Sequence, residues 1–188
     1  RTGRVPIIRK ETANFLQAMV AAKQPKRILE VGTAVGYSAL LMAQVMPEGT
    51  DILTIEKYEP RIPVARRHFE EAGLSDRITL LEGDAGEILK ELDGSFDFIF
   101  MDAAKGQYIH YMPEAVRLLA DGGILMSDNV LQDGDIIESR FAVERRNRTI
   151  HSRMRDYLYE LKHSNVLETS IIPLGDGVAL SIKKKKEE

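Results

Sequence analysis

Short apolar runs rich in β-branched residues alternate with amphipathic stretches along most of the chain. Strands separated by helices of about 10–15 residues are typical of right-handed crossovers, which build a parallel sheet covered by helices on both faces. We therefore predict an α/β fold with a doubly wound, mostly parallel sheet of seven strands. The expected strands are 27–31, 51–55, 78–82, 96–101, 124–127, 168–173 and 178–183.

The stretches between these runs have the spacing of helices, and the end of the chain departs from the alternation. Gly175-Asp176-Gly177 joins the last two runs, and Asp-Gly between two β-runs predicts a hairpin, which would add an antiparallel pair to the sheet. No repeat, low-complexity tract or linker is present, so residues 1–188 are predicted to form a single domain. The expected helices are 11–22, 37–46, 60–72, 85–92, 108–119 and 141–161.

Composition places the chain among globular proteins, because 44% of its residues are hydrophobic and 29% are charged. It contains no cysteine, which excludes disulfides, thiolate catalysis and cysteine zinc sites and is compatible with a reducing cytoplasm. No window approaches the roughly 18 to 20 uninterrupted apolar residues that a membrane-spanning helix needs. We recognise no signal peptide and expect a cytoplasmic protein without a membrane partner.

Positive charge is concentrated in two segments, although the formal net charge is −3. Residues 1–10 contain four Arg or Lys and no acid, and residues 140–163 contain seven Arg or Lys against three acids. A local basic surface attracts phosphates even on a mildly acidic protein. A solvated helix face is the simpler explanation of the same pattern, so charge alone leaves both interpretations open.

The first expected strand leads into a loop with two glycines, within Glu30–Ser38. Glycines here let the backbone approach a ligand at the carboxyl edge of the sheet. Dinucleotide sites use three glycines around a pyrophosphate, whereas this loop has only Gly32 and Gly36 and an acid, Glu30, inside the strand. S-adenosylmethionine (SAM) has no phosphate and carries two cationic groups, so the loop suits SAM better than NAD. We predict that Glu30, Gly32, Gly36 and Ser38 bind SAM.

Two further acids follow the next strands. Glu56 ends the second strand 20 residues after Gly36, where a carboxylate accepts the ribose hydroxyls in nucleotide-binding folds. Asp84 and Ala85 follow the third strand, where Asp84 would meet the adenine amino group. Taken singly, Glu56 is also explained as a surface acid and Asp84 as a helix cap. Their order at successive strand ends favours a nucleoside site.

Oxygen-bearing side chains also end the fourth and fifth strands. Asp102 follows the fourth strand, and Asp128 and Asn129 follow the fifth. Two carboxylates and an amide form a hard, all-oxygen set, which suits Mg2+ or a similar divalent cation, and no histidine falls in these motifs to favour zinc. We predict that Asp102 also contacts the cofactor. Asp128-Asn129 alone is equally explained as a turn.

Lys105 lies three residues after Asp102 and is the predicted catalytic base. From that position its side chain would reach a hydroxyl group bound to the metal, and the nearby dication would disfavour the ammonium form of the lysine. Elsewhere in a sequence, the same residue would be interpreted as an exposed loop lysine.

At these residues the chain resembles the metal-dependent, catechol-type O-methyltransferases, a family that includes the plant caffeoyl-coenzyme A enzymes. The resemblance implies a Rossmann-like methyltransferase fold, SAM as methyl donor and a homodimer. It assigns ribose binding to Glu56, metal binding to Asp102, Asp128 and Asn129, and the role of base to Lys105. The matching motifs, in family order, are ILEVGTAVGYSALLMA at 28–43, GDA at 83–85, MDAAK at 101–105, SDNV at 127–130 and PLGDG at 173–177.

RVPIIRKE near the start and RRNRTIHSRMR at 145–155 resemble a bacterial branch of this family, which includes methyltransferases of 5-hydroxyuridine in the tRNA anticodon. The uracil O4 and the 5-hydroxyl are vicinal oxygens, like those of a catechol. The branch implies that a set of arginines contacts anticodon phosphates, which dominate nucleic-acid affinity. These arginines are Arg4, Arg9, Arg145, Arg146 and Arg148.

Two alternatives remain for the acceptor and the activity. The segment Leu131-Gln132-Asp133-Gly134-Asp135 departs from the aromatic and glycine-rich loop usual in the family, and this loop shapes the acceptor pocket. A small catechol-like or hydroxylated aromatic acceptor is therefore the alternative to tRNA. A non-catalytic nucleoside-binding protein is the third interpretation, although mere binding would need neither the metal set nor Lys105.

Overall fold

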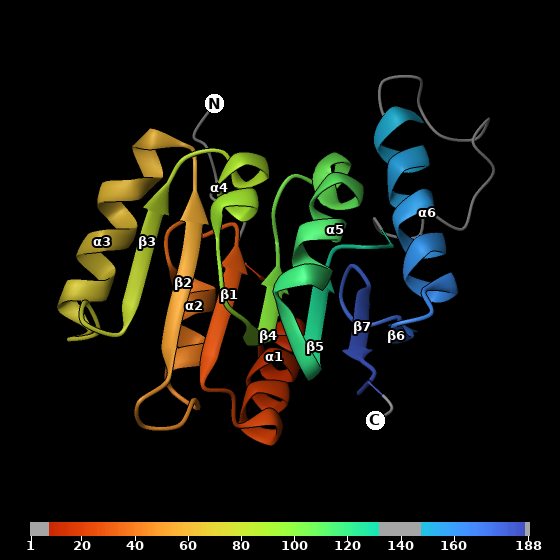
Figure 1. Ribbon diagram of the computed structural model, residues 1–188. Coiled ribbons are helices and arrows are strands. Elements are labelled where there is room, and N and C mark those ends of the chain that lie inside the picture. Colours follow the sequence, from red (N-terminus) through yellow and green to blue (C-terminus); the bar gives the residue numbers. More distant parts are fainter. Residues whose placement is uncertain (1–7, 132–147, 187–188) are drawn as a thin grey trace.

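A computed structural model describes residues 8–131 and 148–186, which form one seven-stranded sheet with helices on both faces (Figure 1). The strand order is β3-β2-β1-β4-β5-β7-β6. Strands β1 to β5 pair in parallel, and β7 is antiparallel to both β5 and β6. The mostly parallel sheet and its C-terminal antiparallel hairpin confirm the predicted fold class.

The elements alternate along the chain as the hydrophobic pattern indicates. The strands are β1 (Arg27–Val31), β2 (Asp51–Glu56), β3 (Ile78–Glu82), β4 (Phe96–Met101), β5 (Leu119–Asp128), β6 (Leu167–Ile172) and β7 (Val178–Lys183). The helices are α1 (Lys10–Lys23), α2 (Tyr37–Ala43), α3 (Ile62–Glu71), α4 (Ala85–Glu91), α5 (Tyr108–Leu118) and α6 (Arg148–His163), with short 3-10 turns η1 (Glu59–Arg61) and η2 (Lys105–Gln107).

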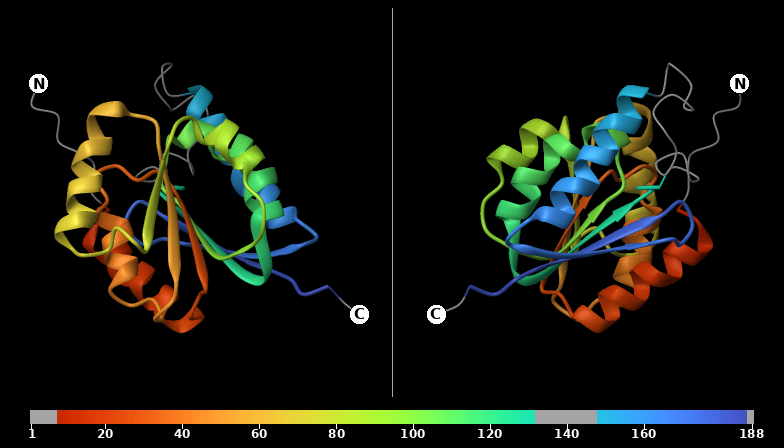
Figure 2. Two further views of the ribbon diagram at one scale, coloured as in Figure 1. Left: turned by 60° about the vertical axis from the view of Figure 1, so that its left-hand side comes forward. Right: turned by 90° about the vertical axis from the view of Figure 1, so that its right-hand side faces the viewer.

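Each face of the sheet is covered by its own hydrophobic core, because successive side chains of a strand point to opposite faces. Leu29 and Val31 of β1 join the core beneath α4, α5 and α6, whereas Ile28 joins the core beneath α1, α2 and α3. Figure 2 shows these two groups of helices on opposite sides of the sheet. The strands are therefore buried on both faces, as expected for parallel strands.

Within the described residues, two boundaries differ from the sequence prediction by more than two residues. β5 begins at Leu119 rather than at residue 124, because Leu119 pairs with Phe96 and a register shift absorbs the Asp- and Gly-containing stretch between Leu119 and Ile124. α2 ends at Ala43, although a hydrogen bond from the Met46 N–H to the Met42 carbonyl continues the turn. Helix α6 begins at Arg148, and residues 141–147 of the expected helix lie outside the described residues.

This topology places the carboxyl ends of β1 to β5 along one edge of the sheet. The strand order reverses between β1 and β4, and ligands of open α/β sheets bind at such a switch point. None of the helices in residues 8–131 and 148–186 combines the length and hydrophobicity needed to cross a bilayer.

Candidate active site

A pocket of about 610 Å³ opens at the carboxyl edge of the sheet, a volume in the range of small-molecule sites. It is lined by the loops that follow β1 to β5, by the residues before α1 and by the β6–β7 turn. Seven of the residues that the sequence predicts for the cofactor, metal or base line it. These are Gly32, Glu56, Ala85, Asp102, Lys105, Asp128 and Asn129.

Gly32 allows the end of β1 to approach the end of β4. Its φ of +106° is in the region that favours glycine, and a Cβ there would collide with the backbone carbonyl of Asp102. The Asp102 N–H donates to the Val31 carbonyl at 3.0 Å, which fixes the same approach from the other side. The β1 loop and the first candidate metal ligand are thus held against each other by backbone contacts.

Glu56 shapes the β1 loop while its side chain lines the pocket. Its Oε2 accepts the Ala34 N–H at 2.8 Å, and its Oε1 accepts the N–H groups of Lys57 at 3.0 Å and Tyr58 at 2.8 Å. A carboxylate offers about four lone-pair positions, so these three bonds leave capacity for about one hydroxyl donor. The predicted ribose contact is compatible with this geometry.

Glu30 and Ser38 lie beneath the loop, and neither is among the residues lining the pocket. The Ser38 hydroxyl donates to Glu30 Oε2 at 2.5 Å, and the Thr54 hydroxyl donates to Oε1 at 2.6 Å. Complete burial raises the pKa of the Glu30 carboxyl to about 8, against the lowering effect of these two hydrogen bonds. The network joins β1, β2 and the start of α2 under the site.

The Glu30→Gln variant is expected to flatten the pH dependence of stability. Folded Glu30 retains its proton up to about pH 8, whereas in the unfolded chain its pKa has the ordinary value of 4.5, so the wild-type protein loses stability as pH rises between these values. Glutamine mimics the neutral acid and does not titrate. We expect urea unfolding between pH 5 and pH 8 to show a smaller decline in the variant, by about 2–4 kcal/mol.

The Glu70→Gln variant is the control, because it removes a carboxylate that is exposed rather than buried. Its unfolding free energy should follow that of the wild-type protein across the same pH range. Parallel pH profiles of the wild-type protein and the Glu30→Gln variant would contradict a neutral Glu30.

Gly36 and Asp84 have clear structural roles outside the pocket lining. Gly36 caps α2 with a φ of +87°, and a Cβ there would meet the ring of Phe69 at 2.6 Å. Asp84 caps α4, since its Oδ1 accepts the Gly86 N–H at 2.8 Å, and this hydrogen bond lowers the pKa of its carboxyl. The alternative interpretation of Asp84 as a cap is confirmed, and its contact with adenine stays a prediction.

Asp102, Asp128 and Asn129 meet where β4 and β5 end. The Asn129 amide Nδ2 donates to Asp102 Oδ1 at 3.1 Å, and the Asn129 N–H donates to Asp128 Oδ1 at 2.7 Å. Asn129 has a φ of +60°, a left-handed conformation that asparagine tolerates better than most residues. The backbone after β5 therefore turns sharply, and the side chains of both Asp128 and Asn129 contribute to one cluster.

The electrostatics of this cluster favour a bound cation. Burial raises the pKa of Asp102, and burial followed by repulsion from Asp102 raises the pKa of Asp128 to about 7. Within residues 8–131 and 148–186 no three His, Cys, Asp or Glu side chains are grouped as a metal site, so Asn129 is needed to complete the set. Two destabilised carboxylates beside an amide are the hard oxygen donors that Mg2+ or Ca2+ takes, and the cluster fits such an ion.

Lys105 begins η2 and lines the pocket beside this cluster. Its positive charge partly offsets the rise that burial causes in the pKa values of Asp102 and Asp128, so its ammonium group lies within electrostatic range of the two carboxylates. The structure therefore brings together the predicted base and the predicted metal ligands.

Arg9 and Asp176 form an ion pair at the pocket, and this pairing was not predicted from the sequence. Arg9 Nη2 lies 2.6 Å from Asp176 Oδ1, and both residues line the pocket. The sequence predicted Asp176 only as a turn residue, although it lies in the motif PLGDG. Of the other arginines proposed for tRNA, Arg148 begins α6, while Arg4, Arg145 and Arg146 lie outside the described residues.

Comparison with known proteins identifies relatives of the whole fold. Residues 3–184 match the O-methyltransferase family. Caffeoyl-CoA O-methyltransferase 1 of Eucalyptus globulus is 32% identical over 183 residues, which cover 90% of this chain and 72% of that protein. Catechol O-methyltransferase of Niastella koreensis is 38% identical over 129 residues, which cover 66% of this chain and 58% of that protein.

A solved structure agrees with these matches. The O-methyltransferase from Bacillus cereus in complex with SAH has a TM-score of 0.86 and 26% identity, covering 96% of this chain and 84% of that chain. The fold and the strand-end site define a Rossmann-like methyltransferase, and the chain belongs to the O-methyltransferase family. The resemblance to the catechol and caffeoyl-CoA type is confirmed, whereas the tRNA branch stays a prediction.

Proposed function

We propose that the protein transfers the methyl group of SAM to an acceptor hydroxyl that has a second oxygen beside it, with a divalent cation held by Asp102, Asp128 and Asn129. The observation that carries this proposal is the meeting of those three residues with Lys105 in one pocket. The cofactor is supported by the SAH complex of the Bacillus cereus relative. When bound, the cation would stabilise negative charge on the acceptor oxygens.

The chain's own residues supply the remaining steps. Glu56 would hold the ribose, and the β1 loop around Gly32 would accommodate the methionine part of the cofactor. Lys105 Nζ, once neutral, would accept the hydroxyl proton. The oxygen would then attack the sulfonium methyl in line, breaking the bond between methyl carbon and sulfur and releasing neutral S-adenosylhomocysteine (SAH). Holding the two reactants in one aligned arrangement would supply much of the rate.

The first candidate acceptor is 5-hydroxyuridine in the tRNA anticodon. Cationic side chains lie at the pocket and at the turn that carries Lys105, which supports an acceptor with phosphates. Arg9 is at the pocket lining, and Arg153 of α6 donates to the Gly106 carbonyl at 3.4 Å, so the arginine-rich start of α6 adjoins the turn that carries Lys105. Single-stranded loops can also splay a base into a pocket.

The second candidate is a small catechol-like aromatic, favoured by the names of the relatives, which specify catechol and caffeoyl-CoA. Such an acceptor would chelate the cation with its two oxygens and would need no contact with the arginines of α6. The two candidates therefore share the transfer chemistry and differ in what holds the rest of the acceptor.

One labelling experiment separates them. The protein is incubated with methyl-labelled SAM and Mg2+, with either tRNA that carries unmethylated 5-hydroxyuridine or a simple catechol. We expect label on the 5-oxygen of the tRNA nucleoside, and transfer to tRNA should decline steeply with salt, since phosphate contacts release counterions. Label in catechol alone would favour the second candidate. Bound SAM with label in neither would favour the nucleoside-binding alternative.

A further inference from the structure

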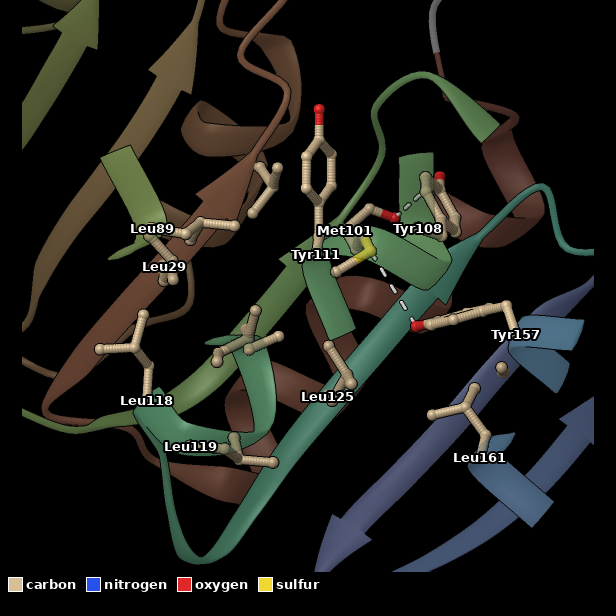
Figure 3. Packing of buried hydrophobic residues seen from close by; sticks show 14 of the residues in the cluster. Leu29, Leu89, Met101, Tyr108, Tyr111, Leu118, Leu119, Leu125, Tyr157 and Leu161 are labelled. Atoms are coloured by element: carbon tan, nitrogen blue, oxygen red, sulfur yellow. Dashed lines mark hydrogen bonds between the residues drawn. The ribbon is translucent and has the colours of Figure 1, made fainter. Parts of the chain in front are cut away.

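Tyr108 lies immediately behind the candidate metal ligands and is completely buried. It begins α5, directly after the η2 turn that carries Lys105. Its hydroxyl is within hydrogen-bond distance of two backbone carbonyls, at 3.0 Å from that of Asp128 and 3.3 Å from that of Met101. Figure 3 shows the ring beside Met101, with its bond to that residue dashed.

These contacts adjoin the ligands themselves. Met101 directly precedes Asp102, and the second contact is the carbonyl of Asp128 itself. One buried hydroxyl group therefore lies between the backbone that leads into one candidate ligand and the backbone of the other.

The pairing between β4 and β5 stops before the ligands, although Asp128 still pairs with Val178 of β7. The last paired residues of β4 and β5 are Met101 and Ser127, one position before Asp102 and Asp128. Beyond that point the hydrogen-bond ladder no longer sets the separation of β4 and β5. Two like-charged carboxylates at the ends of these strands would drive them apart in the absence of a cation. Tyr108 bridges the strand ends where the ladder has stopped.

We propose that Tyr108 is a positioning residue, whose hydroxyl holds Asp102 and Asp128 at the separation a divalent cation requires. This inference rests on the metal site of the proposed function. It assigns no contact between Tyr108 and either the cation or the acceptor. Residues that orient metal ligands from behind typically change metal affinity by about 10- to 100-fold when they are altered.

Tyr157 of α6 offers a matched control. It is also completely buried, and its ring packs edge-on against that of Tyr108 with centroids 5.5 Å apart. Its hydroxyl bonds with the Ser127 hydroxyl at 2.5 Å and with Met101 Sδ at 3.9 Å, both of them side-chain atoms. The Tyr157→Phe variant thus removes the same atom from a neighbouring buried ring and leaves the backbone contacts of the ligands intact.

The test compares the binding of Mn2+ to the wild-type protein, Tyr108→Phe and Tyr157→Phe, measured by electron paramagnetic resonance with SAM present. We expect Tyr108→Phe to weaken Mn2+ binding about 10-fold or more and Tyr157→Phe to weaken it less than about 2-fold. SAM affinity, measured by calorimetry, should be unchanged in both variants. Excess Mg2+ should restore the transfer activity of Tyr108→Phe, since its defect is in metal affinity.

Each contrary result is informative. Equal Mn2+ affinity of Tyr108→Phe and the wild-type protein would overturn the role of Tyr108 and leave the metal site standing. Equal weakening by both variants would also overturn it, because the effect would then come from core packing. A wild-type protein that binds no Mn2+ would overturn the proposed metal site and this inference together.

Discussion

The Asp128→Ala variant is expected to lose methyl transfer by about three orders of magnitude while still binding SAM. The variant removes one of the two carboxylates from the candidate metal cluster. A bound metal lowers the free energy of a charged transition state by several kcal/mol, and this stabilisation would be lost. SAM affinity should persist, because Glu56 and the β1 loop do not depend on Asp128. Steady-state kinetics with saturating Mg2+ and calorimetry with SAM would measure both effects.

Stability distinguishes this loss of function from unfolding. Asp128 is buried, and both its burial and its repulsion from Asp102 raise its pKa to about 7, so the metal-free protein carries an unfavourable carboxylate at neutral pH. The isosteric Asp128→Asn variant should therefore unfold at no lower urea concentration than the wild-type protein. Asp97→Ala, at the other end of β4, is the control and should retain transfer activity. Wild-type activity in Asp128→Ala would remove this residue from the site.

The Lys105→Met variant is expected to lower kcat by about 10²- to 10⁴-fold, the usual contribution of a general base. Methionine retains much of the length of the lysine side chain without its amine. Because neither Glu56 nor Asn129 is changed, the affinities for SAM and for Mn2+ should remain within a few-fold of the wild-type values. Single-turnover transfer at saturating cofactor and acceptor is the appropriate measurement, since it isolates the chemical step.

Lys90→Met supplies the comparison for Lys105. Lys90 is an exposed lysine of α4 that pairs with Glu87 at 3.1 Å, and it is not among the pocket-lining residues. Its loss should leave kcat unchanged. A Lys105→Met variant that reacts as fast as Lys90→Met would show that another group accepts the proton.

Most of the fold follows from the period of the hydrophobic pattern. β1, β3, β4 and β7 begin and end where the sequence predicts, because each is a short apolar run bounded by polar or turn residues. The start of β5 was wrong because Asp121, Gly122 and Gly123 disfavour a strand locally, whereas pairing with β4 stabilises one. Tertiary pairing of this kind has no local signal.

The part of the candidate site that lies at strand ends could be predicted from the sequence. The ends of parallel strands meet at one edge of the sheet, and this rule brings together Gly32, Glu56, Asp102 and Asp128 from the ends of β1, β2, β4 and β5. Glu30 illustrates the limit of this rule. Its alternation with Leu29 and Val31 assigns it to the face of α1, α2 and α3, but only the structure shows it buried under Ser38.

Contacts between distant segments were beyond the sequence. Arg9 precedes α1 and Asp176 lies in the β6–β7 turn, so their meeting at the pocket depends on the assembled fold. Tyr108 was equally hidden, because a tyrosine at the start of an amphipathic helix is usually a core residue. Only the position of its hydroxyl between two strand ends indicates a further role.

The most direct test of this account is the effect of chelation on methyl transfer by the wild-type protein. Transfer from labelled SAM is measured with Mg2+, with excess chelator, and after Mg2+ is added back, using whichever acceptor becomes labelled in the tRNA and catechol experiment. We expect transfer to disappear with chelator and to return with Mg2+, while calorimetry shows SAM bound throughout. Full transfer in excess chelator would contradict a metal role for Asp102, Asp128 and Asn129.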